Sequence, residues 1–107
     1  MLLIGWTTVA TEAEARRLAE AWVDPGLAAC VQIEGPIRSL YRWEGKLEVA
    51  DEYRLMVKFT PERASAVEAC LERLHPYTTP EWVVVRAEKV AEKYLSWARS
   101  NSSSAPL

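Results

Sequence analysis

Several features are scarce in this sequence of 107 residues, and each scarcity excludes a class of protein. Its two cysteines, Cys30 and Cys70, stand far apart, which excludes a disulfide framework and a paired zinc-ligand motif. No apolar run reaches the ~18 residues of a membrane span, and the first residues lack the basic start of a signal peptide. We therefore expect a cytoplasmic protein with no membrane partner.

An excess of either charge sign is also missing. The 13 Lys and Arg residues nearly balance the 15 Asp and Glu residues, for a net charge of −2, and neither half of the chain is basic. A surface that binds nucleic acid would need a basic patch, so we expect no nucleic-acid partner.

Enzyme motifs are lacking as well. The chain has no Gly-rich phosphate loop, no HExxH and no G-x-S-x-G, and its one histidine has no serine motif to serve. We expect no enzyme, with an unrecognised hydrolase as an alternative.

The patterns that are present predict alternating strands and helices. Thr11 and Glu14 form a capping box that begins a helix, and Thr60 before Pro61 is a predicted N-cap for another. Hydrophobic spacing and turn residues place the elements as follows: strands over 2–9, 28–34, 37–43, 48–59 and 81–87, and helices over 11–23, 60–74 and 90–99.

This order predicts an α+β fold of the ferredoxin-like, split βαβ type, written β-α-β-β-α-β plus a C-terminal helix. The helices would cover one face of the sheet. Residues 1–99 form a single domain, and residues 100–107 form a polar tail that we expect to be disordered.

One strand of the predicted hairpin is too long for a domain of this size. The run over 48–59 would span roughly 40 Å at ~3.3 Å per residue, against a radius of gyration of about 13 Å for a compact chain. The hairpin must therefore bend at a bulge or project. Because Tyr41 and Trp43 lie on the projecting part, we expect it to pair with a neighbouring copy, with these two residues at the interface. The alternative is a bulged hairpin that is complete in one chain.

Four segments together resemble the CutA family of divalent-cation tolerance proteins. They are residues 27–31 (LAACV), 39–48 (SLYRWEGKLE), 74–81 (LHPYTTPE) and 94–97 (YLSW), and they occur in family order. The resemblance implies a ferredoxin-like subunit in a compact homotrimer with intersubunit strand pairing, similar in architecture to PII signalling proteins. It also implies a role in tolerance of copper or other divalent metals.

The candidate metal ligand is His75, the only histidine. Imidazole binds copper and zinc well, but a stable site needs three or four ligands, which could come from Glu81 or from another chain. Trp6 and Leu74 stand where some family members have Cys and His, so the resemblance implies weak binding through His75. The alternative is that His75 only caps the last carbonyls of a helix.

The resemblance also implies a cleft between subunits that could bind a small molecule or an anion. Its candidate residues are Lys46, Glu48, Lys58, Tyr77 and Glu81. These residues could equally be solvated charges that protect strand edges. A PII-like sensor with a ligand in this cleft is therefore the alternative to a metal-binding homotrimer.

The remaining notable side chains are expected to pack. We expect Cys30 and Cys70 to be core residues, and the alternative for Cys30 is binding of Cu(I). Among the five tryptophans, Trp22 lies on the buried stripe of a helix, and Trp43 at a turn is the expected interface anchor.

Overall fold

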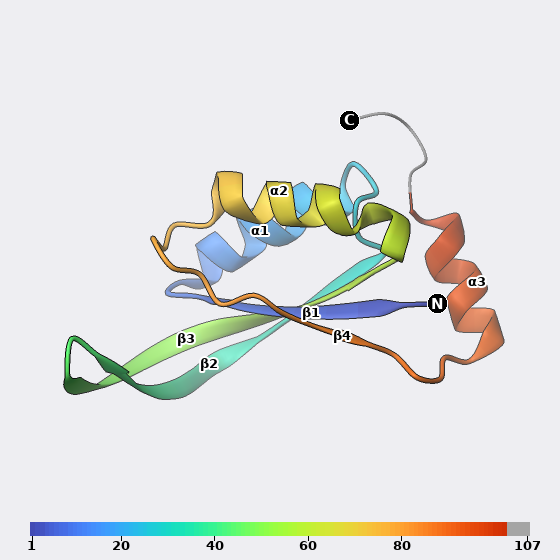
Figure 1. The fold of residues 1–107 in the computed structure, drawn as a ribbon. Helices are drawn as coiled ribbons and strands as arrows, with labels where there is room; N and C mark the ends of the chain where they lie inside the picture. The colour runs from blue at the N-terminus through green and yellow to red at the C-terminus, as the bar shows by residue number, and fades with distance from the viewer. Residues whose placement is uncertain (103–107) are drawn as a thin grey trace.

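The computed structural model describes residues 1–102, which form one antiparallel four-stranded sheet with two helices over one face and the C-terminal helix at its end (Figure 1). The strands lie in the order β2-β3-β1-β4. The elements are β1 (Leu3–Val9), α1 (Glu12–Val23), β2 (Cys30–Trp43), β3 (Lys46–Phe59), the 3-10 turn η1 (Pro61–Arg63), α2 (Ala64–Leu74), β4 (Val83–Arg86) and α3 (Glu92–Ser100). The predicted α+β, ferredoxin-like order is confirmed, including the C-terminal helix.

The first helix begins where the capping residues predict. The Thr11 hydroxyl accepts a hydrogen bond from the backbone N–H of Glu14 at 3.1 Å and donates to the Glu14 carboxylate, also at 3.1 Å. This satisfies one of the free N–H groups at the helix start. The helix then buries Ala15, Leu18 and Trp22 against the sheet, as their spacing predicts.

The second helix departs from prediction at its start. The chain first makes the 3-10 turn η1, in which the backbone carbonyl of Thr60 accepts the N–H of Arg63 at 3.0 Å. Thr60 does stand at the N-cap, with Pro61 directly after it, but it caps the 3-10 turn and its side chain makes no capping hydrogen bond. The stripe along α2 is confirmed, with Val67, Cys70 and Leu71 buried.

The core lies between α1, α2 and one face of the sheet. Leu55, Val57 and Phe59 alternate along β3 and are fully buried on that face. Trp82 closes the core from the segment before β4, with its ring centroid 6.0 Å from that of Phe59. Its indole lies so close to Gly5 on β1 that any side chain there would collide with it.

The hairpin both bends and projects. Its strands β2 and β3 have 14 residues each, against ~5–6 in a typical strand. The predicted break at Gly35 and Pro36 is a bulge within one strand, where the register shifts between Glu34 and Ile37. A bulge accommodates a proline that cannot donate to the ladder, so pairing continues to the turn. The radius of gyration is 14.5 Å, larger than the roughly 13 Å of a compact chain.

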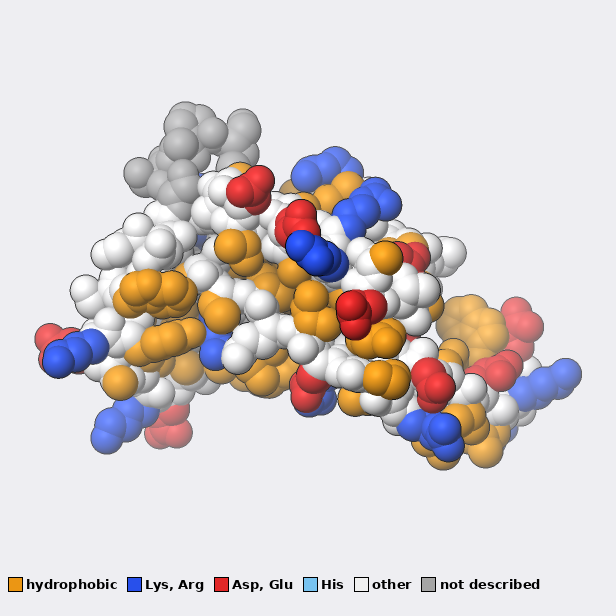
Figure 2. All heavy atoms as spheres, turned by 180° about the vertical axis from the view of Figure 1, so that it is seen from behind, with side chains coloured by type: hydrophobic (Ala, Val, Ile, Leu, Met, Phe, Trp, Pro, Cys, Tyr) orange, Lys and Arg blue, Asp and Glu red, His pale blue; other side chains and the backbone are white. Residues whose placement is uncertain are grey.

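The hairpin and the opposite sheet edge leave large apolar side chains exposed. Leu40 and Leu47, near the hairpin turn, are 63% and 65% exposed, and Val83 on the edge strand β4 is 52% exposed. Figure 2 shows hydrophobic side chains gathered across the middle of the molecule and again at the hairpin end. Such surfaces on a small protein are typical of contacts with another molecule.

The C-terminal part continues the helix further than predicted. The helix α3 ends at Ser100, and the Ser102 hydroxyl donates to the carbonyl of Ala98 at 3.0 Å. The rest of the predicted polar tail, residues 103–107, lies outside the described residues. Within residues 1–102, no helix combines the length and the apolar character needed to cross a membrane.

Candidate functional site: an acidic, aromatic cleft

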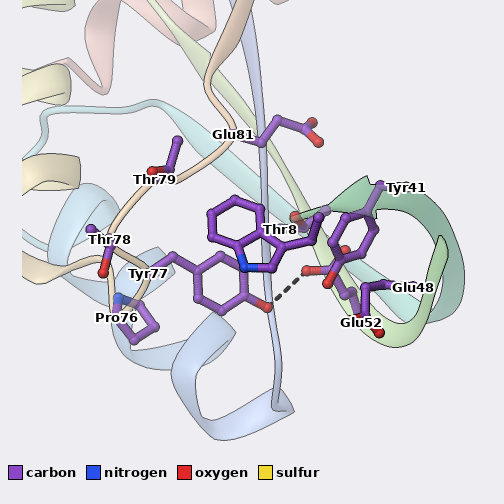
Figure 3. A pocket seen from close by; sticks show the side chains of 10 residues that line it. Thr8, Tyr41, Glu48, Glu52, Pro76, Tyr77, Thr78, Thr79 and Glu81 are labelled. Atoms are coloured by element: carbon purple, nitrogen blue, oxygen red, sulfur yellow. Dashed lines mark hydrogen bonds between the residues drawn. The ribbon is translucent and has the colours of Figure 1, made fainter. Parts of the chain in front are cut away.

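A cleft of about 580 Å³ opens between the end of the hairpin and the loop that follows α2 (Figure 3). It brings together residues from β1, from the hairpin and from the loop after α2. Its lining is Thr8, Tyr41, Trp43, Glu48, Glu52, Pro76, Tyr77, Thr78, Thr79 and Glu81.

The hairpin supplies one wall because of its register. Tyr41 on β2 pairs with Glu48 on β3, and Ile37 pairs with Glu52. Paired residues of an antiparallel ladder share a face, and so do residues two apart on one strand. Tyr41, Glu48 and Glu52 therefore point to the same side, toward the loop after α2.

The opposite wall is fixed by Tyr77. Its hydroxyl donates to Oε2 of Glu52 at 2.8 Å, the bond drawn in Figure 3. Glu52 is only 8% exposed, so this bond satisfies a carboxylate oxygen that is largely removed from water. Burial, followed by the hydrogen bond to Glu52 and its charge, raises the pKa of Tyr77 well above its ordinary value, so the hydroxyl stays a donor at neutral pH.

His75 anchors the same loop to β1. Its Nε2 lies 2.9 Å from the carbonyl oxygen of Thr8 and 3.0 Å from the hydroxyl of Thr7, and its Nδ1 accepts the backbone N–H of Tyr77 at 3.1 Å. A carbonyl only accepts, so its partner Nε2 carries the proton and the ring is neutral. Burial lowers the pKa of His75, which favours this neutral form. The alternative prediction is that His75 only caps the last carbonyls of a helix. Its backbone N–H does donate to the carbonyl of Leu71 at 2.8 Å, but its ring bonds β1 and Tyr77 instead.

The predicted cleft residues divide into two groups. Glu48, Tyr77 and Glu81 line the cleft. Lys46 lies on the same strand face, nearer the turn, but is not in the lining. Lys58 lies about 20 Å along β3 from Glu52, where its ammonium donates to Gln32 and sits 5.4 Å above the ring of Tyr94. The lining of this cleft within one protomer therefore contains carboxylates and neither lysine.

Glu52 is the main cleft residue that the sequence analysis missed. A signal was present, because Glu48 and Glu52 are four apart in a strand and must share a face. The contact with Tyr77 could not be read in this way, since it joins residues 25 positions apart.

The structure places the remaining metal-ligand candidates apart. Cys70 is buried in α2, and burial raises the pKa of its thiol. Cys30 is half-buried on β2, and both cysteines are free thiols. No three His, Cys, Asp or Glu residues come together as a metal-ion site in the described part of the protomer.

Burial is confirmed for Trp22, whereas the interface role of Trp43 stays a prediction. Trp22 is fully buried, and its Nε1–H donates to the carbonyl of Val67 at 3.0 Å. Trp43 is 54% exposed at the hairpin end, where it lines the cleft.

Fold and site together define a class: a ferredoxin-like α+β subunit with an extended hairpin and a carboxylate-lined cleft. The chain matches the family model described as "CutA1 divalent ion tolerance protein" over residues 3–101. The chain therefore belongs to the CutA family of divalent-cation tolerance proteins, as its sequence motifs predicted.

Individual relatives agree with this assignment. The chain is 39% identical over 95 residues to the divalent-cation tolerance protein CutA of Thermus thermophilus, covering 89% of this chain and 92% of the relative. The solved structure of CutA from Synechococcus elongatus matches with a TM-score of 0.91 and 42% identity, covering 95% of this chain and 90% of that one. The structure named as the periplasmic divalent cation tolerance protein CutA of Archaeoglobus fulgidus matches with a TM-score of 0.89 and 34% identity, covering 94% and 98%.

Proposed function

We propose that this chain acts in tolerance of divalent cations, copper among them, as a homotrimer that binds metal ions weakly. Membership of the CutA family over nearly the whole chain carries the proposal. Deletion of the gene should make cells more sensitive to added copper, and the wild-type copy should restore growth. Equal growth of deleted and restored cells across copper concentrations would contradict the role.

His75 is the proposed metal ligand. Both of its ring nitrogens already make hydrogen bonds, so an ion must displace either Thr8 or the N–H of Tyr77 before it binds. This competition favours weak binding. Calorimetric titration with Cu(II) should give a weak binding isotherm that His75→Gln abolishes. An unchanged isotherm would remove His75 from the site and leave Cys30 as the ligand to test next.

The homotrimer is proposed from the uncovered side of the sheet. Pairing of Trp6 with Val83 and Met56, and of Ile4 with Val85, puts these five apolar residues on the face opposite α1 and α2. Val83 and Val85 are 52% and 43% exposed there. Packing three such faces together would bury them, and strand pairing through Tyr41 and Trp43 would cover the free hairpin edge.

Sedimentation tests this assembly. The wild-type protein should sediment at three times the mass of the 12.1 kDa chain, and Val83→Asp should shift it toward the monomer. Glu88→Asp, an exposed change just beyond β4, is the control and should leave the mass unchanged. A wild-type monomer at micromolar concentration would contradict the trimer.

We also propose that the protein is not an enzyme. A histidine base needs a free ring nitrogen, and a cysteine nucleophile needs a reactive thiolate. His75 uses both nitrogens in structural hydrogen bonds, and burial raises the pKa of Cys70. Turnover of a generic ester or phosphate that is lost on mutation of one cleft residue would instead support the hydrolase alternative.

A cytoplasmic location is proposed from the cysteines. Cys30 and Cys70 are free, the state that a reducing compartment maintains. Since the relative from Archaeoglobus fulgidus is named periplasmic, fractionation of cells expressing the tagged chain is the direct test. Recovery with the periplasmic fraction would overturn this assignment.

The alternative function is a sensor that binds a small molecule in the cleft, completed by a neighbouring subunit. Glu48, Tyr77 and Glu81 support it because they converge on one cavity. An anion is disfavoured as the ligand, because the part of the lining described within one protomer supplies no lysine or arginine. A thermal-shift screen should find compounds that raise the unfolding temperature of the wild-type protein but not of Glu81→Gln.

A further inference from the structure

The cleft carries negative charge that nothing in its lining balances. Among residues 1–102 of one protomer, Glu48, Glu52 and Glu81 face it and no Lys or Arg does. The whole chain is close to neutral, with 13 basic and 15 acidic residues, so the imbalance is local to this site. A concave wall of one charge sign concentrates the electrostatic potential and attracts a ligand of the opposite sign.

The same walls are aromatic. Tyr41, Trp43 and Tyr77 contribute rings to the lining, and Tyr41 and Trp43 remain 45% and 54% exposed within one protomer. The face of an aromatic ring attracts a cation that lies within about 6 Å of its centre, and a tryptophan does so most strongly. Figure 3 shows Tyr41 beside Glu48 and Glu52, so ring and carboxylates are available to the same ligand.

Size and spacing separate two kinds of cation. A metal ion needs several ligands on one point, and no group of three such residues is found among residues 1–102. The carboxylates instead surround a cavity of about 580 Å³, which is within the ~300–1,000 Å³ range of small-molecule sites. An organic cation gains from the carboxylates and from the rings, whereas a hydrated metal ion gains from the carboxylates alone.

We propose that this cleft binds an organic cation, with an alkylammonium or guanidinium group held by Glu48 and Glu81 and its apolar part against Tyr41 and Trp43. The proposal rests on the cleft alternative given above and names the class of its ligand. Glu52 acts as a positioning residue, because its Oε2 is taken by the hydroxyl of Tyr77.

The test uses the full chain and benzyltrimethylammonium chloride as the probe, with sodium benzenesulfonate as the anion of similar shape. Calorimetry should show saturable binding of the ammonium, no binding of the sulfonate, and weaker binding as salt is added. Glu48→Gln and Glu81→Gln should each weaken binding about threefold to tenfold, since each removes one attractive charge near the ligand. Trp43→Leu should weaken it about twofold to fivefold.

Glu72→Gln is the matched control. It makes the same charge change at an exposed position on α2, outside the lining, and should leave the affinity unchanged. Equal affinity in Glu72→Gln and Glu81→Gln, equal binding of the sulfonate, or displacement of the ammonium by Zn²⁺ in a Glu81-dependent manner would each overturn the proposal.

Sedimentation and a Cu(II) titration on the same samples keep this result separate from the proposed function. If the protein is trimeric and binds copper but does not bind the ammonium, only the proposed ligand class is overturned. A protein that is monomeric yet binds the ammonium with Glu81 dependence supports the ligand class and overturns the quaternary proposal.

Discussion

Nδ1 of His75 accepts the backbone N–H of Tyr77 at 3.1 Å, while Nε2 of the same ring reaches the carbonyl of Thr8 at 2.9 Å. One neutral imidazole thus ties the loop after α2 to the end of β1. The rings of His75 and Tyr77 also meet edge-on, with centroids 5.0 Å apart. The position of Tyr77 in the cleft therefore depends on the protonation state of His75.

The first prediction concerns pH. Burial lowers the pKa of His75 below its ordinary value of 6.5, so the unfolded chain binds a proton more readily than the folded one. The free energy of unfolding should therefore fall as pH drops below about 6.5, with a slope of at most ~1.4 kcal/mol per pH unit from this residue. The fall from His75 ends once pH is below its folded pKa.

Urea denaturation at fixed protein concentration, from about pH 8 down to 5, measures this slope. His75→Gln is expected to flatten the profile, because glutamine does not titrate in that range. Parallel profiles for the two proteins would show that another group controls the acid sensitivity.

The second prediction concerns the bond from Tyr77 to Glu52. Tyr77→Phe keeps the ring but removes the hydroxyl that donates to a carboxylate only 8% exposed. The expected loss is about 1.5–3 kcal/mol in the free energy of unfolding, as for a hydrogen bond to a charged group. Tyr94→Phe on α3 removes a hydroxyl outside the cleft and should change the stability much less. Equal losses in both variants would count against a special role of this bond.

The third prediction concerns the contact of β1 with Trp82. A Cβ at Gly5 would lie 2.4 Å from the indole, so Gly5→Ala should destabilise the protein by about 1–3 kcal/mol through overpacking. Trp82→Leu removes the ring, and the double variant should lose less stability than the sum of the two single variants. Thermal unfolding of all four proteins gives this coupling. Strict additivity would mean that the ring moves aside freely.

The fourth prediction concerns Trp22. Its fully buried Nε1–H donates to the carbonyl of Val67 at 3.0 Å, a bond that phenylalanine cannot make. Trp22→Phe leaves this carbonyl without its partner and opens a void, so we expect a loss of about 2–3 kcal/mol. Trp97→Phe, at a position 46% exposed on α3, should stay within ~0.5 kcal/mol of the wild type. Denaturant titration compares the two, and a similar cost for both would contradict the assigned burial.

Local patterns in the sequence determined the elements and the family. The helix start at Thr11 and the buried stripe through Trp22 follow from capping and spacing, which act over a few residues. Thr60 shows where such reasoning ends. Its neighbours favour an α-helix capped by the hydroxyl, but the chain makes a 3-10 turn in which the backbone carbonyl of Thr60 accepts the N–H of Arg63 and the hydroxyl makes no capping bond.

Tertiary structure alone decided the composition of the cleft. The bulge and the twist of β2 and β3 set where the hairpin end lies, and the bonds of His75 set where the loop lies. Both effects depend on contacts between residues remote in sequence. Local spacing therefore could not predict that Tyr77 bonds Glu52, or that Lys58 lies outside the cleft. The pattern of a strand predicts which of its residues share a face. Which other residues pack against that face is decided only by how the segments are arranged in space.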